Sequence, residues 1–111
     1  PYLNHYAIER DDIDTVMASA SAYLKEHEGT HISGPGRHPI GGNVFWYLRD
    51  PAGNYFEQFA DMDCIEDDEA WEIVDWNPPG WSLCGGEGQP EGFFKPTDMA
   101  EIIEGYNKYH G

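Results

Sequence analysis

Hydrophobic and polar residues alternate at the start of the chain and then change to a helical spacing. Over residues 2–9, YLNHYAIE, the alternation predicts a strand with Leu3, His5 and Ala7 on one face. Acidic residues and then Gly29 mark the ends of a predicted helix over about residues 12–27. Its apolar stripe has the i, i+3, i+4, i+7 spacing of an amphipathic helix and consists of Ile13, Val16, Met17, Ala20 and Leu24.

Three further strands are predicted in the middle of the chain. Glycine and proline crowd HISGPGRHPIGG, residues 31–42, which predicts a short strand or an irregular loop at the edge of a site. NVFWYLRD and NYFEQFAD then predict a hairpin with a tight turn at DPAGN. In its first arm, Phe45, Tyr47 and Arg49 alternate with residues of the opposite face. The predicted order of elements is therefore βαβββ.

Composition changes beyond residue 62, where an acidic run precedes a stretch rich in Trp, Gly and Pro. This tail is predicted to be mostly irregular, with a closing helix in TDMAEIIEGYNKYHG and Thr97 as its N-cap. We expect one α+β domain. Residues 1–62 form a βαβββ half-module with a mixed, cupped sheet and one packed helix, and residues 63–111 form the irregular tail and C-terminal helix of the same domain.

Length and charge narrow the classes of function. A chain of 111 residues forms one compact unit at most. With 21 acidic residues against 6 Lys and Arg, the formal charge of −15 argues against a nucleic acid partner. The sequence has neither a membrane-length apolar stretch nor a signal-peptide layout, so a cytoplasmic protein without a membrane partner is expected. Cys64 and Cys84 are read as ordinary thiols. Because strand-like sequence starts at once after Pro1, we expect a fragment or a truncated product.

His5 and Glu57 are the polar residues that fit least well into their predicted strands. Burying a carboxylate costs several kcal/mol unless it is paired or bound to a metal. Taken singly, each residue is explained by solvent exposure or a hydrogen bond. Taken together, an imidazole and a carboxylate on neighbouring strands suit a divalent ion with open positions, as in the 2-His-1-carboxylate sites of non-haem Fe(II) oxygenases. The chain offers two of these three ligands.

The segments LNHYAIE, GPGRH and NVFWYLRDPAGNYFEQF, in a βαβββ order, resemble the last module of a type I extradiol dioxygenase. That group belongs to the vicinal-oxygen-chelate superfamily of glyoxalases, bleomycin-resistance proteins and dioxygenases. The resemblance covers about residues 2–76 and implies that His5 and Glu57 bind Fe(II) or, less often, Mn(II). It also implies that His38 hydrogen-bonds the substrate or bound oxygen and that Tyr47 lies near a catecholate oxygen, both as catalytic residues.

Part of the family's site is absent from this chain. The first metal histidine and the acid-base histidine belong to the preceding module, and His27, His31 and His110 do not match their positions. The resemblance thus implies a module of an enzyme that cleaves catecholic rings with O2, incomplete here and completed by a missing N-terminal part or by a homodimer. Two alternatives stay open. One is a glyoxalase-like metal-dependent dimer with a shared His2Glu2 site. The other is a metal-free module that binds small molecules in a cup lined with aromatic residues, for which Trp46, Trp71, Trp76 and Trp81 are candidates, although packing in the core and under the tail is the favoured interpretation of these four.

Overall fold

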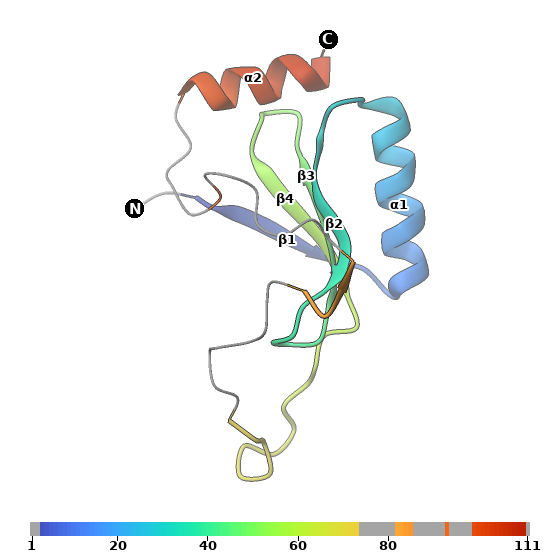
Figure 1. The fold of residues 1–111 in the computed structure, drawn as a ribbon, viewed down its shortest axis with the longest axis vertical. Coiled ribbons are helices and arrows are strands. Elements are labelled where there is room, and N and C mark those ends of the chain that lie inside the picture. Colours follow the sequence, from blue (N-terminus) through green and yellow to red (C-terminus); the bar gives the residue numbers. More distant parts are fainter. Residues whose placement is uncertain (1–2, 74–81, 86–92, 94–98, 111) are drawn as a thin grey trace.

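The computed structural model describes residues 3–73, 82–85, 93 and 99–110. The chain forms a mixed five-stranded sheet in the order β1-β4-β3-β2-β5, in which β1 and β4 run parallel and the other neighbours antiparallel (Figure 1). The predicted α+β class and βαβββ order are confirmed. In sequence, the elements are β1 (His5–Glu9), α1 (Ile13–Glu26), β2 (His31–Arg37), β3 (Val44–Arg49), β4 (Tyr55–Ala60), β5 (Cys84–Gly85) and α2 (Met99–His110).

Helix α1 agrees with the predicted range to within a residue at each end. The Asp12 side chain caps it by accepting a hydrogen bond from the backbone N–H of Thr15 at 2.7 Å. Val16 and Ala20 of the apolar stripe are fully buried. Ala20 packs on Leu48 of β3 and Phe56 of β4, so α1 covers one face of the sheet.

The strands at the two edges of the sheet differ most from the prediction. Strand β1 begins at His5 rather than at residue 2, and Leu3 is 57% exposed instead of facing inward. Strand β5 was not predicted, because its two residues, which pair with Gly36 and Arg37, are too few to produce a periodic pattern.

Of the four tryptophans proposed for a metal-free binding site, the two that the structure describes do not gather on the open face, the sheet face opposite α1. Trp46 packs against the cluster of Ala20, Leu48 and Phe56 beneath the helix, as core packing requires. Trp71 is 40% exposed. Trp76 and Trp81, like the predicted N-cap Thr97, lie outside the described residues.

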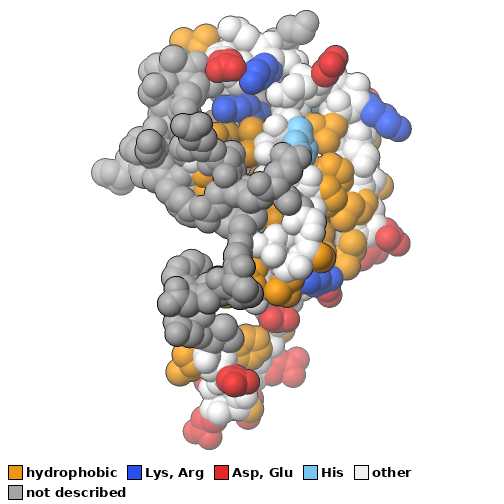
Figure 2. All heavy atoms as spheres, in the orientation of Figure 1, with side chains coloured by type: hydrophobic (Ala, Val, Ile, Leu, Met, Phe, Trp, Pro, Cys, Tyr) orange, Lys and Arg blue, Asp and Glu red, His pale blue; other side chains and the backbone are white. Residues whose placement is uncertain are grey.

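Residues 61–73 are exposed throughout and extend away from the sheet (Figure 1). Acidic side chains stand out at this end of the molecule (Figure 2). Cys64 and Cys84 are exposed, free thiols. In the described parts of the chain, neither helix has the length and apolar character needed to span a bilayer.

Helix α2 lies across the turn between β3 and β4 (Figure 1). The backbones of the helix and the turn approach each other closely at two glycines. A Cβ added to Gly105 would lie 2.9 Å from the Cα of Gly53. A Cβ added to Gly53 would lie 2.3 Å from the Ile102 carbonyl oxygen. Gly53 also has a φ of +90°, which disfavours any L side chain. Helix α2 can therefore pack this closely against the turn only because Gly53 has no side chain.

We expect Gly53→Ala to displace α2 and to lower the free energy of unfolding by at least about 2 kcal/mol, because backbone strain adds to a backbone clash. Gly29→Ala is the matched control. Its φ of +83° carries the same strain, but its added Cβ would meet only Lys108 side-chain atoms at 3.8 Å or more. Amide exchange over residues 99–110 should accelerate in Gly53→Ala alone. Equal acceleration in both variants would show that the close approach does not hold α2.

Candidate metal centre

Strand pairing places three of the predicted site residues together on the open face. Tyr47 and Glu57 are direct partners in the antiparallel β3–β4 ladder. In the parallel β1–β4 ladder, Glu57 is opposite Ala7, two residues along from His5. Residues two apart on a strand share a face, so His5 and Glu57 lie diagonally across neighbouring strands. The register, and not only the alternation, therefore brings these side chains within contact distance.

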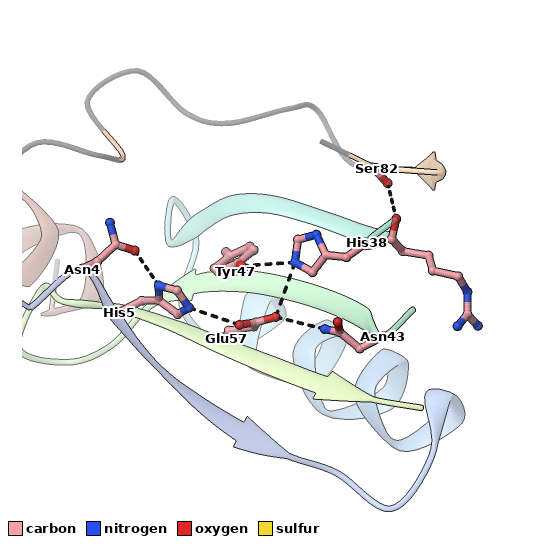
Figure 3. A network of polar contacts seen from close by, with 8 residues as sticks. Asn4, His5, His38, Asn43, Tyr47, Glu57 and Ser82 are labelled. Carbon is pink, nitrogen blue, oxygen red and sulfur yellow. Dashed lines mark hydrogen bonds and ion pairs between the residues drawn. The ribbon is translucent and has the colours of Figure 1, made fainter. Parts of the chain in front are cut away.

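Glu57 is the centre of this group, as Figure 3 shows. It is only 6% exposed, and its carboxylate is surrounded by groups that can donate or carry positive charge. His5 Nε2 lies 3.2 Å from Oε2 and His38 Nε2 lies 3.8 Å from Oε1. The Asn43 side-chain amide donates to Oε1 at 3.5 Å. A buried carboxylate requires such compensation.

His5 is the most accessible member, with a side chain that is 27% exposed. Its Nε2 faces Glu57, while its Nδ1 lies 2.5 Å from the side-chain oxygen of Asn4. The ring also meets the edge of Tyr47, with 5.2 Å between ring centroids and an angle of 80° between planes. Both ring nitrogens thus have polar neighbours, and only Nε2 points toward the carboxylate.

His38 comes from the loop that follows β2. Its backbone N–H donates to the Asn43 carbonyl at 3.0 Å, and its ring stacks on Phe45 with centroids 4.1 Å apart. Its Nε2 lies 3.3 Å from the Tyr47 hydroxyl. The predicted loop at the edge of a site therefore holds His38 against Tyr47 and Glu57.

Tyr47 is 3% exposed, so its hydroxyl lies within the packed group. Burial, followed by the negative charge of Glu57 and a hydrogen bond to it, raises the pKa of the Tyr47 phenol well above its ordinary value. The phenol therefore stays protonated near neutral pH and acts as a hydrogen-bond donor.

All four predicted site residues come together, whereas the other histidines have different surroundings. His27 stacks on Tyr109 at 4.0 Å between centroids, and His31 Nε2 lies 3.0 Å from the Gly34 carbonyl oxygen. Among the residues that the structure describes, no three His, Cys, Asp or Glu side chains form a group able to hold a metal ion. The described residues thus bring together one histidine and one carboxylate as a pair of metal-ligand candidates, and their roles stay a prediction.

Sequence reasoning missed three neighbours of this site, namely Asn4, Asn43 and Phe93. Phe93 is 4% exposed and packs on Phe45 and Tyr47, although it lies 36 residues beyond Glu57. Asn4 precedes His5 directly, and adjacent residues of a strand point to opposite faces. Because β1 begins only at His5, that alternation does not apply to Asn4.

Comparison with known proteins gives two curated relatives. Metapyrocatechase 2 of Cupriavidus necator is 34% identical over 95 residues, which are 86% of this chain and 29% of the relative. The manganese-dependent 2,3-dihydroxybiphenyl 1,2-dioxygenase of Geobacillus genomosp. 3 is 36% identical over 76 residues, which are 67% of this chain and 24% of the relative. The chain thus spans less than a third of the length of these relatives.

Neither a protein-family model nor a solved structure matches the chain. The matches to the two curated enzymes nevertheless cover 86% and 67% of the chain. The resemblance predicted from the motifs is therefore confirmed at modest identity: the chain is related, over part of their length, to the catechol extradiol dioxygenases of the vicinal-oxygen-chelate superfamily.

Proposed function

We propose that this chain supplies part of the metal centre of an extradiol ring-cleaving dioxygenase, with His5 and Glu57 as ligands. One observation carries the proposal, namely the 3.2 Å separation of His5 Nε2 and Glu57 Oε2 on the open face, with the carboxylate buried. Two ligand atoms that bind one ion at about 2.1 Å and at a right angle lie about 3 Å apart. The pair is therefore spaced as neighbouring ligands of a single ion.

The donor set fits a divalent transition metal. One imidazole and one carboxylate are the ligand types of non-haem iron sites, and carboxylates also suit manganese. One curated relative is named as manganese-dependent. We propose Fe(II) as the metal of this site, with Mn(II) as the alternative.

The remaining ligands come from outside the described group. The chain corresponds to less than a third of either relative, so further ligands are expected from the rest of a longer enzyme. A second copy of this chain is the other source, and it would give a His2Glu2 set about a twofold axis. The two sources differ in the ratio of metal to chain and in the solution mass.

The proposed substrate class rests on the same two relatives. Both relatives are catechol dioxygenases, so we propose a catechol-type aromatic substrate cleaved with O2. The metal would act as a Lewis acid that binds and polarises the two catechol oxygens. Tyr47, held protonated, would donate its one hydrogen bond to a substrate oxygen in place of Glu57. His38, 3.3 Å from that hydroxyl, would accept a proton from a catechol hydroxyl of the substrate and later return it.

Replacing either ligand should remove the metal. We expect His5→Ala and Glu57→Gln to lose stoichiometric Mn(II) or Fe(II), because each removes one of the few direct bonds to the ion. The matched control is Glu9→Gln, an exposed carboxylate at the end of β1, which should bind metal as the unmodified chain does. The measurement is metal content with solution mass on anaerobically purified protein. Full metal occupancy in either ligand variant would contradict the assignment, and a metal-free monomer would contradict a site completed by a second copy.

Tyr47→Phe should keep the metal while lowering ring-cleavage turnover by about 10²-fold, the lower range for loss of one hydrogen bond donated to a reacting oxygen. Tyr55→Phe is the control, because Tyr55 shares the open face but lies under the Arg49 guanidinium, 4.8 Å from its ring centroid. Turnover of a catechol is followed in the assembly that is active, with metal content measured on the same samples. Equal turnover in both variants would remove Tyr47 from the reaction.

A further inference from the structure

Asn4 lies between a candidate metal ligand and the tail of the chain. Its side-chain oxygen lies 2.5 Å from His5 Nδ1, and its side-chain amide nitrogen donates to the carbonyl oxygen of Phe93. Figure 3 draws the contact between Asn4 and His5. Asn4 and Phe93 are 89 residues apart in the sequence. One side chain therefore touches both the site and a distant segment.

These two contacts decide how the Asn4 amide is oriented. A backbone carbonyl oxygen only accepts hydrogen bonds, so the NH2 group of Asn4 must face Phe93. The amide oxygen is then the atom that faces His5, and it too only accepts. The hydrogen bond at 2.5 Å consequently requires a proton on His5 Nδ1.

This orientation has a direct consequence for the other ring nitrogen. In a neutral imidazole with its proton on Nδ1, Nε2 has a free lone pair. That lone pair points toward Glu57 Oε2, 3.2 Å away. Without Asn4, the ring would instead favour a proton on Nε2, where the Glu57 carboxylate is a strong acceptor. Asn4 thus opposes the tautomer that would block a metal ligand.

Phe93 contacts the site with its side chain as well as with its backbone. Its ring is buried and packs on three rings of the open face, with centroid distances of 5.8 Å to His5, 5.4 Å to Tyr47 and 5.7 Å to Tyr55. This packing restrains the residue whose carbonyl oxygen accepts the hydrogen bond from the Asn4 amide. The tail therefore reaches His5 both through packing and through a hydrogen bond.

We propose that Asn4 is a positioning residue that couples the tail at Phe93 to the metal-binding tautomer of His5. The effect on metal affinity rests on the proposed function, but the effect on the tautomer does not. The two parts can therefore be tested separately on the same 111-residue chain.

The test records long-range 1H–15N correlations of the chain with 15N-labelled histidine, without metal and at alkaline pH, where free imidazole is neutral. In the unmodified chain, His5 should carry its proton on Nδ1. In Asn4→Leu it should shift to Nε2, and Mn(II) affinity should fall by about 10- to 100-fold, the range for loss of a residue that orients a metal ligand. Asn4→Asp, which keeps an acceptor beside Nδ1, should keep the original tautomer.

A second variant separates coupling from simple structural support. Phe93→Leu leaves every hydrogen-bonding side chain of the site in place but changes the packing that positions the carbonyl. We expect a mixture of both His5 tautomers, with the His31 signals unchanged as an internal control. A His5 proton that stays on Nδ1 in Asn4→Leu would overturn the proposal. A tautomer shift in a chain that binds no Mn(II) in any form would support the role of Asn4 and count against a metal site completed by a second copy of the chain.

Discussion

The burial of the Glu57 carboxylate is the constraint on which the open face depends. A charged group taken out of water loses several kcal/mol of hydration, and the surrounding protein must replace that interaction. Here the replacement comes from His38, Asn43 and Tyr47, which reach Glu57 from β3 and from the loop after β2. The site is therefore the arrangement that makes a buried carboxylate tolerable.

The same arrangement accounts for the state of the surrounding groups. Tyr47 stays protonated because it is buried beside a negative charge, and that proton gives Glu57 a donor. The two histidines approach different oxygens of the carboxylate. A divalent ion beside Glu57 would replace this compensation by a direct bond to the carboxylate.

The tail contributes more to the site than its composition indicates. Phe93 closes the aromatic packing over His5 and Tyr47, and α2 is placed by a glycine contact with the β3–β4 turn. These contacts attach residues beyond the βαβββ unit to the turn and to the open face of the β3–β4 hairpin. We therefore propose that residues 63–111 belong to the same domain as residues 1–62.

The sequence by itself determined where α1 and the hairpin lie and which side chains share a face of a strand. Periodicity of 3.6 located α1, and the turn chemistry of DPAGN located the hairpin. Strand alternation gave the residues that share a face with His5 and with Tyr47, and the family resemblance grouped both with Glu57. Only the tertiary structure decided the contacts of Asn4 with Phe93, the pairing of β5 and the docking of α2. The physical reason is that periodicity records which way a side chain points relative to its neighbours in sequence. Contact between segments as far apart as 89 residues depends on the path of the chain and leaves no local pattern.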